Sequence, residues 1–414
     1  MKLLAGFLLL ATSVLAYGAP GSAISGTWEG TATVHGQQVP VRLQLTGTGS
    51  NLKAALVNGP ETSAASSATV TGNHLLVTFN YYAKTLDATL ADGQLTGSFG
   101  TVKTRYPVTL HPAIVASEAG PGAPDIGGDW EIAVKSAKDE SAWQLRVQPQ
   151  PQAGEVKAVI QRIDGDTGSL YGPWVDHAYR VSHFTAAGPA LYTLAPQADG
   201  TLLVSNLLRA DVNDQQNLVA RRPDAARAAK LAGPTDPTQQ TSVKNPNERF
   251  AFSFPDLHGK VVSNTDPQFD GKVVIVAIGG SWCPNCHDEA PFLESLYKQF
   301  HGRGLEIVDL SFEEGDQLKD PTRLHAFIDR YGITYTVLVA GDPDQLNEKI
   351  PQAVHLNSWP TSFILGRDGR VREVHAGFAG PANPQGHEEL VKEMTALVEQ
   401  LLAEPAPTQS ASVR

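Results

Sequence analysis

The stretch from Lys272 to Phe300 constrains the fold of this chain more than any other part of its sequence. It begins with a continuous apolar run, residues 273–278, which is too short for a helix and is typical of a strand buried on both faces of a parallel sheet. After two glycines, apolar residues recur at helical spacing over residues 292–300. The sequence therefore predicts a strand, a tight turn and a helix, with Cys283 at the first turn of that helix.

Cys283 and Cys286 are the only two cysteines among the 414 residues. At a helix N-terminus, free backbone N–H groups and the positive end of the helix dipole stabilise a thiolate, which predicts Cys283 as the nucleophile. Cys286 lies almost one turn further on, so it can close a disulfide with Cys283 and is predicted to be the deeper, resolving thiol. A purely structural disulfide is disfavoured, because so short a ring restrains little of the unfolded chain.

A metal site is the alternative interpretation of the same residues. Cys283, Cys286 and His287 are adjacent donors. Structural zinc takes four ligands, usually as two spaced pairs, and the sequence offers no second pair. Redox chemistry is therefore favoured, and metal binding stays open as the second hypothesis.

At the level of motifs, residues Phe250 to about Leu402 resemble the TlpA-like branch of extracytoplasmic thiol:disulfide oxidoreductases in the thioredoxin superfamily. The resemblance lies in the lead-in FPDLHGKVVSNTDPQFDGKVV, the WCPNC core and the later WPTSFILGRDGRV. It implies an α/β thioredoxin-fold domain over residues 250–403 that acts as a thiol-disulfide oxidoreductase. It also implies no cofactor beyond the redox-active Cys283–Cys286 disulfide.

The resemblance further implies roles for residues around the cysteine pair. Pro360 is expected to follow a cis peptide bond and to face the cysteines, where it presents backbone to an extended substrate peptide. Trp282, Trp359 and Thr361 flank these motifs and are the expected substrate contacts. Glu289, one turn beyond Cys286, is expected to relay protons to and from the dithiol.

One departure from the family pattern affects this proton relay. Many thioredoxins have a buried acid on the strand six residues before the first cysteine, where this sequence has Ala277. The relay is therefore expected to depend on Glu289 or on water. Asp309, Glu313 and Glu314 follow near the end of the next predicted strand. The favoured interpretation is that they lie in a solvated loop, and the alternative is that their charges influence the site.

The pattern after the cysteines predicts alternating strands and helices, then a hairpin, and hence a mixed sheet. Gly377, after the last strand, is expected to allow close approach of another backbone segment. The predicted elements are strands at 305–310, 336–339, next to Pro360 and at 371–375, and helices at 321–331 and up to Leu402.

The N-terminus reads as an export signal. Residues 1–16 combine a positive start, an apolar core and a V-L-A cleavage site, which predicts a secretory signal peptide rather than a membrane span. The expected location is therefore outside the cytoplasm, most simply the bacterial periplasm, with a soluble protein after cleavage. An uncleaved N-terminal anchor is the alternative.

The net charge of −11 disfavours nucleic acid as a partner, because nucleic-acid binding needs basic patches. The same charge disfavours binding to anionic membrane surfaces.

The N-terminal half shows the pattern of antiparallel strands. Short alternating runs are broken by Gly, Asn-Gly and Asp-Gly, and ISGTWE at Ile24 is echoed by IGGDWE at Ile126. This spacing predicts two tandem all-β domains, at 23–115 and 124–222, with one larger β-sandwich as the alternative. The fold class is therefore multidomain, with two all-β domains followed by the thioredoxin-fold domain.

The tryptophans of this region are expected to be core anchors; they are Trp28, Trp130, Trp143 and Trp174. Residues 223–249 lack periodicity and are predicted to form a linker that gives the redox domain reach, with one short helix at 224–231. Residues 404–414 are predicted to form a disordered tail.

The functional hypothesis is thiol–disulfide exchange, in which Cys283 attacks a substrate disulfide and Cys286 resolves the mixed disulfide. The resemblance favours a reductase over an oxidase. A reductase outside the cytoplasm needs an electron donor, so a membrane thiol transporter is the expected partner. The alternative is a non-enzymatic binding protein whose β-domains carry the function while the CxxC binds metal or senses redox state. A thiol peroxidase is disfavoured, because it would want a lone peroxidatic cysteine in a different motif.

Overall fold

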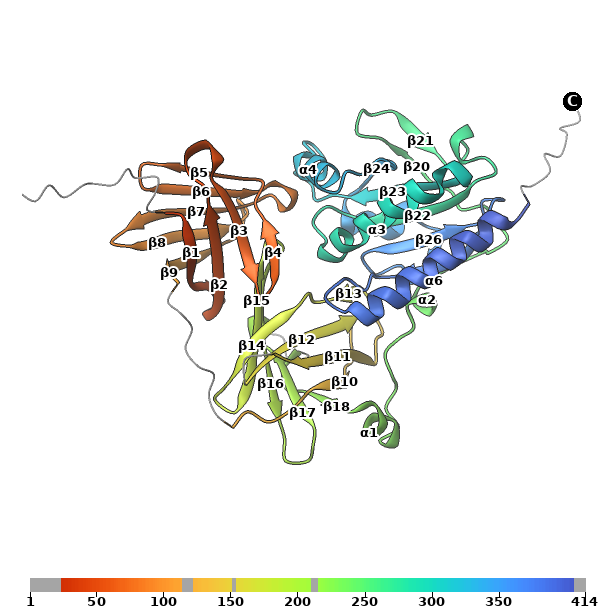
Figure 1. Ribbon diagram of the computed structural model, residues 1–414. Coiled ribbons are helices and arrows are strands. Elements are labelled where there is room, and N and C mark those ends of the chain that lie inside the picture. The colour runs from red at the N-terminus through yellow and green to blue at the C-terminus, as the bar shows by residue number, and fades with distance from the viewer. Residues whose placement is uncertain (1–23, 114–121, 151–153, 210–214, 406–414) are drawn as a thin grey trace, which may run out of the picture.

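The computed structural model describes residues 24–113, 122–150, 154–209 and 215–405, and builds two β-units and one α/β unit (Figure 1). The predicted signal peptide at 1–16 lies outside these ranges, as does the predicted tail beyond residue 405. Within the same ranges, no helix is long and apolar enough to cross a membrane.

The first β-unit is a nine-stranded antiparallel sheet in which β9 returns to pair with β1. Its edge strands β4 and β5 are joined by a link whose N–H groups bond back to Ala54 and Thr78, so the sheet curls almost into a barrel. Alternate residues of each strand point inward, as in β2, where every second side chain is buried. The strands are β1 (Gly26–Val34), β2 (Gln37–Thr46), β3 (Lys53–Asn58), β4 (Glu61–Ala64), β5 (Ser67–Thr71), β6 (His74–Phe79), β7 (Lys84–Ala91), β8 (Gln94–Gly100) and β9 (Arg105–Pro112).

The second β-unit is also a nine-stranded antiparallel sheet, and an additional pairing of β11 with β12 closes it on itself. Its strands are β10 (Gly128–Ala133), β11 (Ala142–Pro149), β12 (Glu155–Arg162), β13 (Gly165–Asp166), β14 (Leu170–Val175), β15 (Ala178–Thr185), β16 (Gly188–Pro196), β17 (Leu202–Asn206) and β18 (Leu218–Arg221). Two separate sheets thus occupy the region predicted to be all β, rather than one larger sandwich.

The internal repeat seen in the sequence has a structural counterpart. The indole N–H of Trp28 donates to the carbonyl of Ile24 at 2.8 Å, and that of Trp130 donates to the carbonyl of Ile126 at 2.9 Å. Both rings are buried, as is Trp143, whereas Trp174 is only partly buried. The prediction of core anchors is therefore confirmed for three of the four tryptophans.

The β15–β16 hairpin of the second unit reaches the first, as Figure 1 shows for β15 beside β3 and β4. Phe184 and Leu191 from this hairpin belong to the buried apolar cluster of the first sheet. The Phe184 ring lies 4.9 Å from that of Phe99. The first β-unit therefore completes its core with side chains from the second. The predicted division into domains at 23–115 and 124–222 does not anticipate this shared core.

The α/β unit contains a five-stranded sheet in the order β24-β23-β22-β26-β27. Its first three strands are parallel, and β26 and β27 are antiparallel to their neighbours. The main elements are β22 (Val273–Gly279), α3 (Pro284–Phe300), β23 (Leu305–Phe312), α4 (Thr322–Tyr331), β24 (Thr336–Gly341), β26 (Thr361–Leu365), β27 (Val371–Ala376) and α6 (Pro384–Ala403). Shorter elements are β20 (Ser253–Pro255), β21 (Val261–Ser263), α5 (Leu346–Lys349) and β25 (Ala353–Val354). Every strand and helix predicted after the cysteines is present, within a few residues of its expected bounds.

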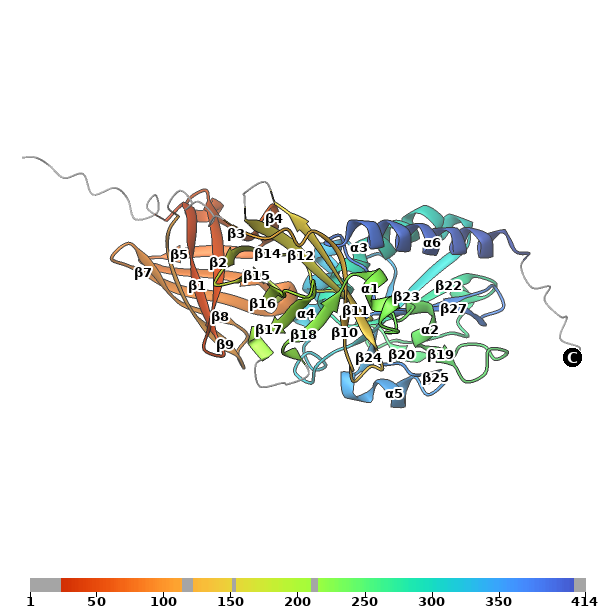
Figure 2. The ribbon, with the colours of Figure 1, turned by 90° about the horizontal axis from the view of Figure 1, so that it is seen from below.

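The segment predicted to be a linker is folded against both of its neighbours. It contains α1 (Pro223–Ala228), α2 (Pro237–Gln240) and β19 (Ser242–Val243), which pairs with β25. The side chain of Gln240 is buried and donates both to the carbonyl of Lys138 and to Asn357. The expectation of a tether that gives reach is therefore wrong for this structure, because the segment bridges the second β-unit and the α/β unit. Figure 1 shows the second β-unit below the other two units, and Figure 2 views the molecule from that side.

Candidate active site around Cys283 and Cys286

The cysteine pair lies where the sequence predicts it, at the start of α3. Cys283 is the residue before the helix, and its Sγ accepts a hydrogen bond from the backbone N–H of Cys286 at 3.3 Å. Both are free thiols, with exposed fractions of 2% and 5%. Burial raises the pKa of the Cys286 thiol, and its hydrogen bond with Cys283 raises it further. Cys286 is therefore protonated in this state, as suits a resolving thiol.

Aromatic rings and a cis-proline form the wall beside the cysteines. The Trp359–Pro360 peptide bond is cis, as the resemblance implied. The ring of Trp359 packs edge-on against those of Trp282, at 5.3 Å, and Phe312, at 5.7 Å. The indole N–H of Trp282 donates to the carbonyl of Phe312 at 2.9 Å. These contacts hold both tryptophans next to the dithiol.

Thr361, an expected substrate contact, has its side chain turned inward. It is fully buried at the start of β26, and its hydroxyl donates to the carbonyl of Ser358 at 2.8 Å. Thr361 can therefore meet a substrate only through its backbone, while its side chain supports the loop before Pro360.

Two buried carboxyl groups lie beneath the dithiol. Glu289 on α3 accepts a hydrogen bond from Ser362 Oγ at 2.9 Å. Ala277 on β22 pairs with Ser362 on one side and with Asp309 on the other. A methyl group placed on Gly279 would lie 3.3 Å from Cys286 Sγ and 3.8 Å from Asp309 Oδ1. Many thioredoxins have a buried acid at the position of Ala277. Here Asp309 on the neighbouring strand β23 places a carboxyl group beside that position instead.

The environment of these two acids keeps them protonated up to neutral pH. Burial raises the pKa of Glu289 to about 8, against the opposing effect of the Ser362 hydrogen bond. Burial also raises the pKa of Asp309 to about 7, and the negative charge of Glu313 raises it further. Both groups can therefore exchange a proton with a thiol near physiological pH.

The expectation that Asp309 and Glu313 lie in a solvated loop is wrong. Asp309 is 8% exposed within β23, and Glu313 is fully buried. Glu313 accepts from the backbone N–H of Ser281 at 2.7 Å and from Arg323 at 2.8 Å. Only the third acid, Glu314, has a half-exposed side chain, which pairs with Arg323 at 2.7 Å. This cluster fixes Ser281, two residues before Cys283.

His287 is committed to hydrogen bonds rather than free to bind a metal. One ring nitrogen lies 2.9 Å from the carbonyl of Ser281, to which it must donate, and the other lies 3.0 Å from the hydroxyl of Tyr331. Burial lowers the pKa of His287 to about 3, so the ring is neutral. In the part of the chain that the structure describes, no group of three or more His, Cys, Asp or Glu is arranged to hold a metal ion.

The first β-unit also reaches this helix. The ring of Tyr82 stacks on that of His287 at 4.1 Å, and the guanidinium of Arg330 lies 3.9 Å from the ring centre of Tyr81. A cavity of about 880 Å³ lies between the three units, lined by these tyrosines and by Pro284 and Asn285 between the cysteines. The β-units therefore border the dithiol, which the sequence did not indicate.

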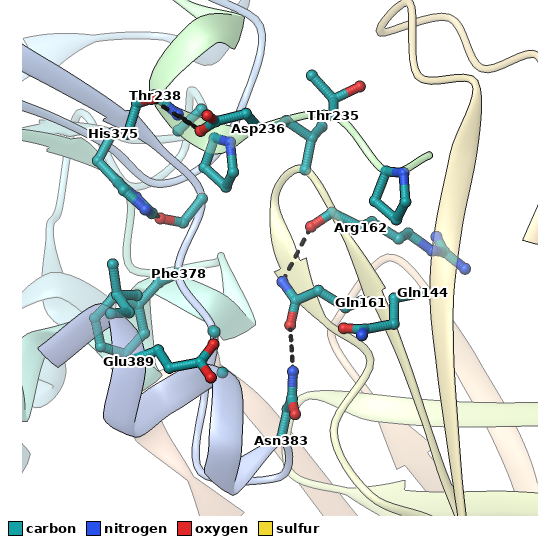
Figure 3. Close-up of a pocket in the computed structure, with 18 of the residues that line it drawn as sticks. Gln144, Gln161, Arg162, Thr235, Asp236, Thr238, His375, Phe378, Asn383 and Glu389 are labelled. Carbon is teal, nitrogen blue, oxygen red and sulfur yellow. Dashed lines mark hydrogen bonds between the residues drawn. The ribbon is translucent and has the colours of Figure 1, made fainter. Parts of the chain in front are cut away.

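The second β-unit docks on the same face of the α/β unit. Asn383 of the α/β unit donates to Gln161 at 3.2 Å and accepts from Arg146 at 2.9 Å. A smaller cavity of about 280 Å³ lies beside this contact, between Gln161 and Arg162 on one side and His375 on the other (Figure 3).

The fold and the site define a thioredoxin-fold domain with a CxxC pair at the start of its first long helix. Residues 247–374 match the AhpC/TSA family. Together with the relatives below, this match confirms the resemblance for the C-terminal region, which is a TlpA-like thioredoxin-fold domain.

Several of the matching relatives are named thiol-disulfide oxidoreductases. The ResA protein of Bacillus thuringiensis (strain Al Hakam) is 30% identical over 122 residues, which are 30% of this chain and 64% of that protein. The ResA protein of Bacillus subtilis is 28% identical over 136 residues, which are 33% of this chain and 69% of that protein. The chain thus spans somewhat less than two thirds of the first relative.

Among solved structures, a putative thiol:disulfide interchange protein DsbE from Chlorobium tepidum is 24% identical to this chain. The superposition covers 38% of this chain and 99% of that one, with a TM-score of 0.30. StoA of Bacillus subtilis is 22% identical and covers 35% of this chain, with a TM-score of 0.26.

Proposed function

We propose that this chain is an extracytoplasmic thiol–disulfide oxidoreductase that reduces disulfides of substrate proteins. The observation that carries the proposal is the geometry of Cys283. Its sulfur caps a helix and accepts the N–H of Cys286 at 3.3 Å, next to the cis bond before Pro360. A sulfur that accepts a hydrogen bond at a helix N-terminus is stabilised as the thiolate, which is the nucleophile in disulfide exchange.

The reaction consists of two exchanges. In the first, the Cys283 thiolate attacks one sulfur of the substrate disulfide, so that a mixed disulfide forms and the other substrate sulfur leaves as a thiolate. In the second, Cys286 loses its proton and attacks the sulfur of Cys283, which releases the second substrate thiolate. The substrate disulfide is thereby reduced to two thiols, and the CxxC is oxidised to a disulfide.

Glu289 and Asp309 serve the second exchange. Cys286 is buried and protonated, so its attack needs a nearby acceptor for the proton. The two carboxyl groups lie beneath it, with pKa values raised by burial to about 8 and about 7. They accept that proton when ionised, and return a proton to a leaving thiolate when neutral.

Trp282, Trp359 and the backbone around Pro360 and Thr361 form the surface against which the substrate lies. No cofactor other than the Cys283–Cys286 pair takes part. Regeneration of the dithiol needs two electrons from outside this chain, and a membrane thiol transporter is the proposed donor. The predicted export signal at residues 1–16 supports a location outside the cytoplasm, most simply the periplasm.

A trapping experiment tests the function. In the Cys286→Ser variant the second exchange cannot occur, so Cys283 should remain linked to insulin, a protein with accessible disulfides, as a mixed disulfide stable in non-reducing gels. The matched Cys283→Ser variant should trap nothing, since burial raises the pKa of the Cys286 thiol and keeps it protonated. A Cys286→Ser variant that traps nothing while the wild type binds zinc or copper tightly would instead support the binding-protein hypothesis.

A further inference from the structure

Residues 163–166, which comprise the two-residue turn after β12 and the short strand β13 and are called the turn below, touch backbone groups of the redox site. The N–H of Trp359 donates to Asp164 Oδ1 at 3.0 Å, and the N–H of Phe378 donates to the Asp164 carbonyl at 3.1 Å. Gly165 and Phe378 form a parallel β-bridge. A turn of the second β-unit is thus bound like a short strand on both sides of Pro360.

Two glycines make this approach possible. A Cβ on Gly377 would lie 1.9 Å from the carbonyl oxygen of Ile163. A Cβ on Gly165 would lie 2.2 Å from the carbonyl oxygen of Phe378 and 2.7 Å from the side chain of Asn285. Asn285 stands between the two cysteines, so the turn reaches the CxxC itself. The close backbone approach predicted at Gly377 is confirmed, and the segment that approaches is this turn.

The turn is supported from its own side. Asp164 forms an ion pair with Lys138. The N–H of Ile163 donates at 2.8 Å to Glu140, a buried carboxyl group that also accepts from Ser136. The contact is therefore held in place by side chains of the second β-unit.

The position of the turn coincides with the surface that the proposed reaction needs. An extended substrate would pair with the backbone next to Pro360, where the N–H of Trp359 is a donor. That donor is already bound to Asp164, and Cys283 is only 2% exposed.

We infer that residues 163–166 act as an internal pseudosubstrate, which occupies the binding surface of the redox site and must be released before a polypeptide disulfide reaches Cys283. The inference rests on the proposed function, since it concerns the substrate surface of that same site. The turn satisfies two backbone N–H groups of the redox site, that of Trp359 through the Asp164 side chain and that of Phe378 through the Asp164 carbonyl, so an extended segment that presents acceptors at these two places can replace it. The device therefore selects for substrates that compete for this surface, and it protects the thiolate from stray oxidation in their absence.

Alkylation of Cys283 tests the inference in the full chain, with Cys286→Ser as background so that one thiol is read. Asp164→Ala removes the acceptor of the Trp359 N–H and the partner of Lys138. A net hydrogen bond is worth a factor of about five to ten in an equilibrium, so labelling by a bulky maleimide should become about fivefold to tenfold faster. Asp164→Asn keeps an acceptor oxygen, so its labelling rate should lie between that of Asp164→Ala and that of the Cys286→Ser background.

Asp92→Ala is the matched control. Asp92 also lies in a hairpin turn before a glycine, between β7 and β8, but on the exposed side of the first sheet. This variant should label at the rate of the background protein. If Asp164→Ala does not fold, as circular dichroism would show, Lys138→Met removes the same ion pair from outside the turn and should also speed labelling.

Equal labelling rates for folded Asp164→Ala, Lys138→Met and Asp92→Ala would overturn the inference. The experiment separates this failure from failure of the proposed function, which is read from reduction of a small aryl disulfide by the chain with both cysteines. Labelling that responds to Asp164 in a protein that never reduces the aryl disulfide would leave the covering turn standing and remove the reductase. Normal reduction of the aryl disulfide, with Cys283 labelling rates that do not respond to Asp164, would support the reductase and overturn the covering turn.

Discussion

Glu289 should make the stability of the redox domain depend on pH in a direction opposite to that of a surface carboxylate. Its pKa is raised from 4.5 to about 8 because it is buried, so the folded protein holds a proton that the unfolded chain releases above about pH 4.5. Stability from this group is therefore complete below about pH 4.5 and is lost as the pH rises through about 8. Each pKa unit corresponds to about 1.4 kcal/mol, so the full loss is about 5 kcal/mol, of which about 3 kcal/mol has occurred by pH 7.

The perturbation that isolates this effect is Glu289→Gln. Glutamine is nearly isosteric, still accepts from Ser362 Oγ, and cannot ionise. The variant should equal the wild type at about pH 4 and exceed it by up to about 3 kcal/mol at pH 7. Glu399→Gln, on the exposed face of α6, is the control and should leave the pH dependence unchanged.

The assay uses the fact that both cysteines lie in the redox domain and are buried. Samples equilibrated in urea at different pH values are jumped to one pH and pulsed with an alkylating reagent, so that labelling reports unfolding of this domain alone. Parallel curves of unfolding free energy against pH for Glu289→Gln and the wild type would show that the carboxyl group ionises in the folded protein, and would refute the reasoning.

Three further outcomes are expected. Arg323→Met should destabilise the redox domain by about 3–5 kcal/mol in the same assay, because it removes the ion-pair partner of the buried Glu313; a loss below about 1 kcal/mol would contradict this. Asp309→Asn should slow the Cys286-dependent release of a trapped substrate at least about tenfold and displace its pH profile, whereas an unchanged profile would remove Asp309 from the proton relay. Gly377→Ala, whose Cβ would lie 1.9 Å from Ile163 O, should destabilise by about 1–3 kcal/mol and speed labelling of Cys283; neither effect would be seen if the turn were loosely held.

The redox domain was predictable because its signals are local. A buried strand, a capped helix and a cis-proline motif are each encoded within a few residues, and the elements found at 273–279, 284–300 and 361–365 follow them. The repeated tryptophan motif likewise placed Trp28 and Trp130 in equivalent positions.

The surroundings of the dithiol were not predictable in the same way. Asp309 lies in an apolar strand followed by acids, and only the register of that strand with Ala277 shows that its carboxyl group is buried under Cys286. An Asp-Gly turn such as 164–165 is typical of any hairpin. Nothing within its sequence indicates that it binds Trp359, which is 195 positions away. Gly377 predicted that a backbone segment approaches closely, but its sequence context did not indicate which segment.

The packing of the β-units against each other was likewise not predictable from local sequence. Alternation predicted the strands, but Phe184 and Leu191 have the same pattern whether they fill their own sheet or the neighbouring one. Residues 223–249 lack periodicity because their contacts, such as those of Gln240, are single hydrogen bonds to two different units.

The reduction potential of the Cys283–Cys286 couple tests the central claim most directly. Equilibration of the full chain against a dithiothreitol or glutathione series should give a single two-electron transition, absent in Cys283→Ser, near the value of about −270 mV found for thioredoxin. A potential near the value of about −120 mV found for DsbA would make the chain a disulfide donor and contradict the reductase. A dithiol that does not equilibrate with either couple would contradict thiol–disulfide exchange itself.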